Sequence, residues 1–182
     1  PTAIVHQRLL IGGLNVRSVN NKSATITDII NSSQLDILAL QETWHENSDS
    51  LTLRRAVPDG YSVIDEARVN KNSASQQHSK FHGGVAIIYR SEYNAKKLVS
   101  LPHFSTFEYV GCRFNASHKG DVVILSVYRP GSKSITSQFF TELTTLFESL
   151  VTFRCPVVIL GDLNIHLERA DDVYSCEFAD LL

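Results

Sequence analysis

Short apolar runs alternate with polar segments along most of the chain. Runs with few internal polar residues predict buried β-strands, because a strand covered on both faces needs apolar side chains at almost every position. A short polar break that contains glycine, at residues 118–121, lies between two such runs and predicts a hairpin. The pattern predicts strands over residues 9–16, 35–40, 61–64, 83–89, 107–114, 122–128 and 157–160.

Helical periodicity is clearest at residues 139–151, where apolar positions repeat at i, i+1, i+4, i+7, i+8, i+11 and i+12. This spacing places them on one face of an amphipathic helix. The polar stretch 18–33 carries three isoleucines at helical spacing, and Asn20 or Asn21 is its expected cap. We also expect a helix over residues 172–182, a short helical turn over 51–57 and a surface loop over 66–80.

Apolar strands mixed with amphipathic helices predict the fold class. The combination is typical of a layered α/β fold in which helices cover the outer faces of the sheets. The chain has 182 residues, of which 43% are hydrophobic and 20% are charged, an ordinary globular composition. This length suits a single domain, residues 1–182, that can bury a substantial core.

Charge and cysteine content exclude several classes of protein. A net charge of −2 excludes a strongly basic nucleic-acid binder, but it allows an enzyme that contacts phosphates locally. Three cysteines without a C-x-x-C pair argue against a disulfide framework or a zinc cluster and favour a reducing compartment. The sequence shows no apolar run near the ~20 residues of a membrane span and no signal peptide. We therefore expect an intracellular protein that is not secreted and contacts no membrane.

Polar residues follow four of the predicted buried strands. Asn15 ends the first strand, Glu42 follows the second, Tyr128 ends the strand at 122–128, and Asp162 and Asn164 follow the last. Functional sites of layered α/β folds gather where strand ends meet loops. If these ends share one edge, they bring together carboxylates, amides and a phenol. A carboxylate such as Glu42 suits Mg²⁺, which takes few protein ligands and keeps several waters.

Each of these residues also has a purely structural explanation. Asn15 can be a turn residue at a strand end, Glu42 a solvated surface acid, and Tyr128 a core aromatic with its hydroxyl hydrogen-bonded. The Gly161-Asp162 pair can be an ordinary turn. The functional interpretation depends on the combination of the residues and on their order along the chain.

Four short motifs carry a family resemblance. L-N-V at residues 14–16, Q-E-T-W at 41–44, V-Y-R-P at 127–130 and G-D-L-N-I-H at 161–166 occur in the order found in the endonuclease/exonuclease/phosphatase superfamily. N-V-R-S from Asn15 onward, followed by a helix and L-D-I-L-A-L-Q-E-T-W, resembles the apurinic-type endonuclease domain of non-LTR (LINE-like) retrotransposons. The resemblance covers nearly the whole chain.

This resemblance implies a DNase I-like two-sheet α/β sandwich and Mg²⁺-dependent hydrolysis of a phosphodiester, with Mn²⁺ as an alternative metal. Glu42 would be the metal ligand, and Asn15 would lie beside the metal and the scissile phosphate. Tyr128 would donate a hydrogen bond to the phosphate or the leaving oxygen. Asp162 would orient or deprotonate the attacking water, and Asn164 would hold the phosphate and Asp162. An anionic transition state needs a cation and hydrogen-bond donors at its oxygens, so these roles are chemically consistent.

The sequence departs from the superfamily pattern in two places. Many relatives carry an acid where this chain has Arg17, which leaves Glu42 as the only clear metal carboxylate. The superfamily also ends in a Ser-Asp-His motif on a late strand, and that motif does not occur in this sequence. We therefore expect a domain that is incomplete at its C-terminus, with the last strands of the second sheet missing.

Three further residues are candidates for contacts with phosphate or DNA: Arg17, Arg129 and His166. His166 lies two positions beyond Asn164, but we do not expect it to replace the missing histidine, which should arrive from a different strand. Trp44 is expected to pack at the rim of the site.

The leading hypothesis is a DNA-nicking endonuclease module of a retrotransposon polyprotein. It would act in the nucleus, as a monomer, upstream of a reverse transcriptase domain whose synthesis the nick primes. One alternative is a superfamily phosphatase that acts on inositol phosphates or sphingomyelin. The other is a degenerate or domesticated fragment without activity, which the absent Ser-Asp-His motif supports. Residues 1–182 alone are expected to be nearly inactive and marginally folded.

Overall fold

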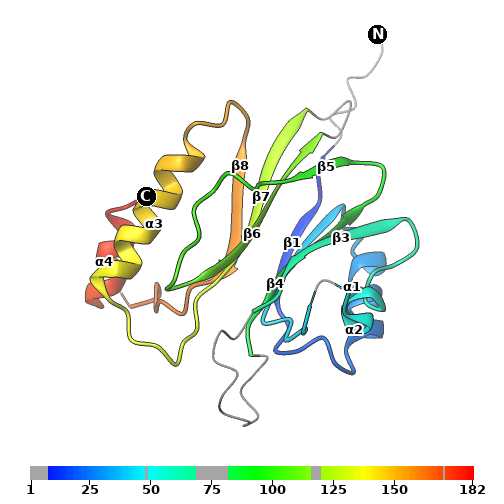
Figure 1. Ribbon diagram of the computed structural model, residues 1–182, viewed down its shortest axis with the longest axis horizontal. Coiled ribbons are helices and arrows are strands. Elements are labelled where there is room, and N and C mark those ends of the chain that lie inside the picture. The colour runs from blue at the N-terminus through cyan, green and yellow to red at the C-terminus, as the bar shows by residue number, and fades with distance from the viewer. Residues whose placement is uncertain (1–7, 48, 69–81, 116–119, 170) are drawn as a thin grey trace.

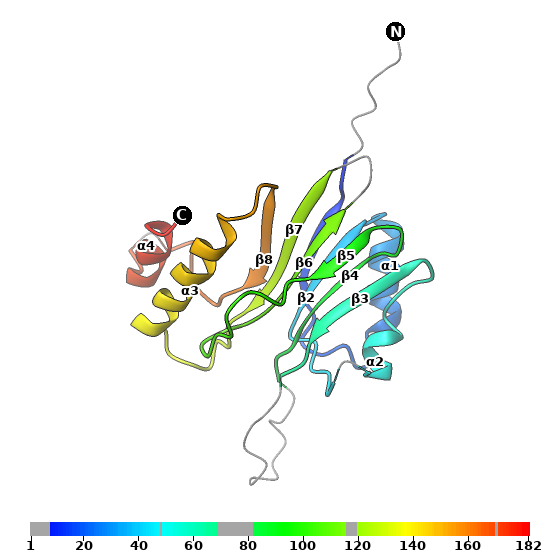
Figure 2. The same ribbon diagram turned by 45° about the horizontal axis from the view of Figure 1, so that its top comes forward.

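Two four-stranded β-sheets pack face to face, and helices cover the outer face of each (Figure 1). The computed structural model describes residues 8–47, 49–68, 82–115, 120–169 and 171–182. Figure 2, turned by 45°, shows the same layers, with α1 and α2 beside the first sheet and α3 and α4 beside the second. The predicted α/β sandwich is therefore confirmed.

The first sheet has the strand order β1-β2-β4-β3. Its β1 and β2 are parallel and are joined through α1, whereas the other neighbours are antiparallel. The strands are β1 (Ile11–Asn15), β2 (Ile37–Gln41), β3 (Tyr61–Glu66) and β4 (Val85–Arg90), and the helices are α1 (Ser23–Ser32) and α2 (Leu51–Arg54).

The second sheet has the strand order β5-β6-β7-β8. Here β7 and β8 form the parallel pair, with α3 as the crossover between them. The strands are β5 (Asn94–Lys97), β6 (Glu108–Asn115), β7 (Asp121–Tyr128) and β8 (Val157–Asp162), and the helices are α3 (Ser137–Leu150) and α4 (Val173–Ala179).

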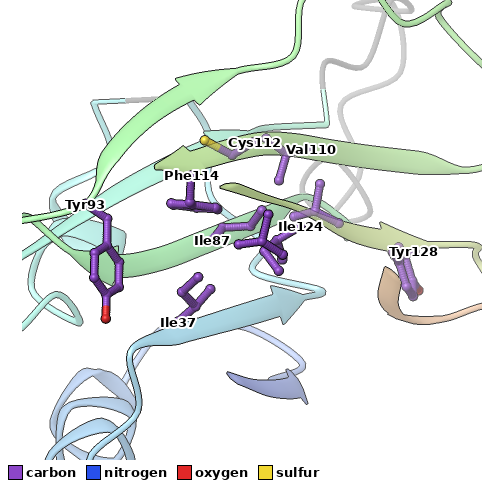
Figure 3. Close-up of a cluster of buried hydrophobic side chains, with 10 residues drawn as sticks. Ile37, Ile87, Tyr93, Val110, Cys112, Phe114, Ile124 and Tyr128 are labelled. Carbon is purple, nitrogen blue, oxygen red and sulfur yellow. The ribbon is translucent and has the colours of Figure 1, made fainter. Parts of the chain in front are cut away.

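Alternate residues of the central strands feed different layers of the core. In β4, Ile87 points between the sheets and Ile88 points toward α1. In β7, Ile124 packs between the sheets and Leu125 packs under α3. Figure 3 shows the layer between the sheets, which includes Tyr128 at its edge. The long apolar runs of the sequence are thus explained by strands buried on both faces.

Three local expectations need correction or lie outside the described residues. No strand was expected at β5, because its sequence Asn-Ala-Lys-Lys is polar. Helix α1 begins after Lys22 without a side-chain cap, so neither Asn20 nor Asn21 caps it. Most of the loop expected at 66–80, and half of the break at 118–121, lie outside the described residues.

Strand β8 forms one edge of the second sheet within the described part of the chain. Its side chains are only partly buried, and Ile159 is 41% exposed, whereas the neighbouring β7 is almost entirely buried. An edge of this kind offers unpaired backbone groups to a further strand. Separately, none of the described helices is long and apolar enough to cross a membrane.

Candidate active site

The ends of β1, β2, β7 and β8 meet at one edge of the sandwich. Parallel pairing sets Asn15 beside Gln41 in the first sheet and Tyr128 beside Asp162 in the second. Because the carboxyl ends of parallel strands lie at the same edge, the polar residues that follow them become neighbours. Strands β1 and β8 also face each other across the sandwich, which closes the group.

Asn15 joins the two acidic residues of this group. Its amide nitrogen Nδ2 donates to Glu42 Oε1 at 2.7 Å and to Asp162 Oδ2 at 2.8 Å. Its oxygen Oδ1 accepts the backbone N–H of Arg17 at 3.2 Å, so the whole amide is engaged. One side chain therefore fixes two carboxylates, from different sheets, within hydrogen-bonding distance of the same atom.

The two carboxylates fit a divalent cation. Among the described residues, neither Glu42 nor Asp162 takes part in an ion pair. No cluster of three His, Cys, Asp or Glu side chains occurs in the described ranges. Mg²⁺ needs only one or two carboxylates and completes its octahedral shell with water and substrate oxygens. The donor set is therefore suited to Mg²⁺.

Tyr128 stands at the inner side of the group. Its ring is 7% exposed, and burial together with the hydrogen-bonded Glu42 carboxylate raises the pKa of the phenol to about 12. A phenol with this pKa stays protonated at neutral pH. It can therefore act as a hydrogen-bond donor beside Glu42, but not as a base.

Left-handed backbone occurs repeatedly in the turns at this edge. Glu42 has φ of 54°, Arg17 of 44°, Trp44 of 53° and Asn164 of 51°. Non-glycine residues adopt this conformation at a cost, and such residues concentrate at functional sites when the surrounding structure imposes them. The turns after three different strands thus share an unusual geometry.

Asp162 is held from two sides. Its Oδ2 accepts Asn15, and its Oδ1 accepts the backbone N–H of Asn164 at 3.0 Å. The side-chain amide of Asn164 donates instead to the carbonyl of Arg129 at 2.7 Å. Asn164 thus orients Asp162 through its main chain, and its amide N–H is used in a loop contact rather than at the acidic group.

The structure does not support the expected contact of Arg129 with DNA. The residue is 3% exposed, and its guanidinium lies over the ring of Phe139, with Cζ 5.6 Å from the ring centroid. Its N–H groups donate to the carbonyls of Leu163 and Asn164 at 2.6 and 2.9 Å, and of Lys133 at 2.7 Å. The expected contact with a DNA phosphate does not fit a side chain turned into the protein. Arg129 joins the β7–α3 loop to the turn after β8.

The other two candidate contacts lie at the surface. Arg17 is exposed beside Asn15. His166 has a side chain that is 61% exposed, and its Nδ1 pairs with Glu168 Oε1 at 3.0 Å rather than with Asp162. Contacts of these two side chains with phosphate stay predictions.

Two buried polar networks behind the site were not apparent from the sequence. Gln41 Nε2 donates to Ser126 Oγ at 2.9 Å, which links β2 to β7 across the core. His45 contacts Thr43 Oγ1 at 2.6 Å and Asp65 Oδ2 at 2.8 Å, which ties the turn after Glu42 to β3. The sequence around Gln41 and His45 gave no indication of these bonds, because their partners Ser126 and Asp65 lie far away in the sequence.

Comparison with known proteins identifies the class. The profile of the Endonuclease/Exonuclease/phosphatase family matches residues 12–181. The chain therefore belongs to this family, whose members are nucleases and phosphatases that hydrolyse phosphodiesters or phosphate esters. Among curated proteins, no sequence matches the chain significantly.

Solved structures agree on the fold. A Neisseria 3′ phosphatase bound to a product DNA hairpin superposes with a TM-score of 0.67 at 20% identity, covering 96% of this chain and 70% of that one. The endonuclease domain of TRAS1, a telomere-specific non-LTR retrotransposon, gives 0.63 at 15% identity, with 93% and 69% covered. The catalytic domain of human Nocturnin gives 0.59 at 17% identity, with 85% and 63% covered.

At such identities these similarities show the fold alone, which is the DNase I-like α/β sandwich. The chain spans 63% to 70% of the lengths of these three proteins. Activity and substrate must therefore be argued from the residues of the site.

Proposed function

We propose that the chain is a Mg²⁺-dependent phosphodiesterase that nicks DNA, as the endonuclease module of a non-LTR retrotransposon polyprotein. The observation that carries this proposal is the double hydrogen bond of Asn15 to Glu42 and Asp162. It unites residues from β1, β2 and β8 into one acidic group beside the phenol of Tyr128. The motifs N-V-R-S and Q-E-T-W favour the retrotransposon branch.

Glu42 would hold the metal, with Asn15 beside it. Bound there, Mg²⁺ would supply positive charge to the phosphate oxygens, which the two unpaired carboxylates cannot do themselves. Mn²⁺, which also prefers oxygen ligands, is the alternative occupant. The remaining chemistry belongs to the protein side chains.

Asp162 is the candidate base. Each of its oxygens accepts one protein hydrogen bond, so lone pairs remain to accept a proton from a water molecule. The hydrogen bonds from Asn15 and Asn164 fix the orientation of the Asp162 carboxylate. A base that is held in position lowers the barrier for attack of the water on phosphorus.

Tyr128 is the candidate donor to the anionic transition state. Its raised pKa keeps the O–H proton in place, and its hydroxyl already lies against the Glu42 carboxylate. A phosphate oxygen next to Glu42 would therefore lie within reach of this O–H group. Donors placed where negative charge develops stabilise the transition state more than the ground state.

The biological setting is part of the proposal. DNA is the proposed substrate, a reverse transcriptase domain of the same polyprotein is the proposed partner, and the nucleus is the proposed place of action. We propose a monomer that contacts no membrane. The fold similarity to the TRAS1 endonuclease domain supports this setting.

A phosphatase is the second candidate, since the similar Neisseria structure is a 3′ phosphatase. The test gives the intact polypeptide that carries this chain two substrates, supercoiled plasmid and an oligonucleotide with a 3′-phosphate. Mg²⁺-dependent conversion of plasmid to nicked circles, abolished by EDTA, supports the endonuclease. Phosphate release without nicking would establish the phosphatase instead, and no reaction with either substrate would favour a degenerate or domesticated protein.

A further inference from the structure

The family motifs leave out a cationic side chain that lies against the candidate site. We propose that Arg68, two residues after β3, binds a phosphate oxygen of the DNA strand beside Tyr128. The proposal rests on the proposed function and names one more substrate contact of the same site. Two observations carry it: the place of the guanidinium and the way it is held.

The guanidinium lies over the site phenol. Its Cζ is 5.9 Å from the centroid of the Tyr128 ring, a cation–π arrangement. Tyr128 lies in register between Glu108 of β6 and Asp162 of β8, so this ring marks the middle of the polar edge. Arg68 thus brings positive charge to a place where the other nearby groups are acidic.

Arg68 is held from two sides. Its Nε forms an ion pair with Glu108 Oε1, and the second oxygen of Glu108 accepts the backbone N–H of Gly84 at 2.6 Å. Glu108 therefore fixes both Arg68 and the start of β4. Arg68 pairs with Glu108 through Nε, and its outer N–H groups donate to no other residue in the described part of the chain, so they can bind a ligand.

Gly83 leaves room for the guanidinium of Arg68. Gly83 has φ of +122°, and a Cβ added there would lie 2.5 Å from Arg68 Cζ. The backbone conformation therefore favours glycine at this position, and a side chain there would displace the guanidinium of Arg68. The side chain of Arg68 is still 25% exposed, so it is ordered by its surroundings and yet accessible to a ligand.

Two other cations near the site are used differently, whereas Arg17 is exposed beside Asn15. Arg129 is buried and bonded to backbone carbonyls. Lys22 donates to the carbonyls of Val16 at 2.5 Å and Arg17 at 3.2 Å, which holds the turn after β1. Arg68 is instead paired with one carboxylate and is pre-organised for planar recognition of phosphate oxygens.

Equilibrium binding of DNA tests the proposal without relying on cleavage. A fluorescein-labelled 20-base-pair duplex is titrated with the intact polypeptide in an Asp162→Asn background, with Mg²⁺ present, at several KCl concentrations. Arg68→Met removes the cation, and Arg68→Lys keeps the charge without the planar fork. Arg113→Met is the matched control, because Arg113 also pairs with an acid, Asp121, but at the opposite end of β6.

We expect Arg68→Met to weaken binding about three- to tenfold and to reduce the slope of log Kd against log salt by about 0.9, the value of one phosphate contact. Arg68→Lys should keep the slope and lose part of the affinity, and Arg113→Met should change neither. Glu108→Gln, which releases Arg68, should cause part of the same loss and add nothing to Arg68→Met.

Unchanged affinity and slope in Arg68→Met would overturn the assignment, as would an equal loss in Arg113→Met. Either result would leave the proposed function standing, because the parent protein would still bind DNA. If the parent neither binds the duplex nor, with Asp162 restored, nicks plasmid, the proposed function fails and the assignment fails with it.

Discussion

Asn15 donates a hydrogen bond of 2.8 Å to Asp162 across 147 positions of sequence, from the first strand of one sheet to the last strand of the other. The same nitrogen reaches Glu42. The two sheets thus meet at this edge through polar side chains, in addition to the hydrogen bond between Gln41 and Ser126 within the core. The bond defines where the candidate site lies, because it brings the acidic residues of both sheets together.

Asn15→Ala removes both donors and leaves two carboxylates facing each other. We expect Mg²⁺-dependent nicking to fall by about 10²–10³, as for loss of a donor at an anionic site. Nicking rates of purified intact protein measure this, with Asn20→Ala, an exposed neighbour outside the site, as the control. A nicking rate near that of the control would show that the hydrogen bonds of Asn15 to Glu42 and Asp162 do not contribute to catalysis.

Asp162→Asn should impair nicking more than Tyr128→Phe. The first change keeps the shape and removes the base, whereas the second deletes a single donor worth about 10²–10³ in rate. Single-turnover rates at saturating Mg²⁺ compare the two. If Tyr128→Phe is silent, the phenol is only a core aromatic.

Arg129→Met should destabilise the fold rather than weaken DNA binding directly. The change leaves several backbone carbonyls without the donor that they share, and we expect about 2–4 kcal/mol lower free energy of unfolding. Urea denaturation followed by circular dichroism measures it. Arg113→Met, which removes a solvent-exposed ion pair, should lower the free energy of unfolding clearly less. Equal losses of unfolding free energy in Arg129→Met and Arg113→Met would contradict the proposal that Arg129 holds the β7–α3 loop against the turn after β8.

Glu142 gives the protein a pH-dependent stability far from the site. Burial opposes its charge, but the hydroxyl and the backbone N–H of both Thr106 and Ser105 donate hydrogen bonds to the carboxylate, which outweigh burial and lower the pKa of Glu142 to about 2. A depressed pKa means stabilisation that is complete above the unfolded value near 4.5 and disappears as pH falls through about 2.

Glu142→Gln should therefore lower Tm at pH 7, and the difference from wild type should shrink between pH 4.5 and pH 2. Thermal unfolding at a series of pH values follows this. Glu148→Gln, on the exposed side of the same helix, should show no such pH-dependent difference. A gap between wild type and Glu142→Gln that stays constant down to pH 2 would contradict the hydrogen-bonded carboxylate.

The sequence predicted the strands that are buried on both faces, because a run such as 122–128 leaves few alternatives to a central strand. It did not predict β5, since an edge strand with two lysines carries no apolar signal. The strand-end residues were found because parallel pairing brings carboxyl ends together. Arg129 was expected to contact DNA but is buried, and no local pattern pointed to the place of Arg68, because the partners of both come from distant segments of the chain.

The most direct test of the central claim is Mg²⁺-dependent nicking of supercoiled plasmid by the intact polypeptide carrying Glu42→Ala. Loss of this ligand should cost several kcal/mol of transition-state stabilisation and abolish nicking, while circular dichroism and Tm stay close to wild type. Glu46→Ala, an exposed acid four residues further along, should keep full activity. Nicking by Glu42→Ala at a rate near that of Glu46→Ala would contradict the proposed metal site.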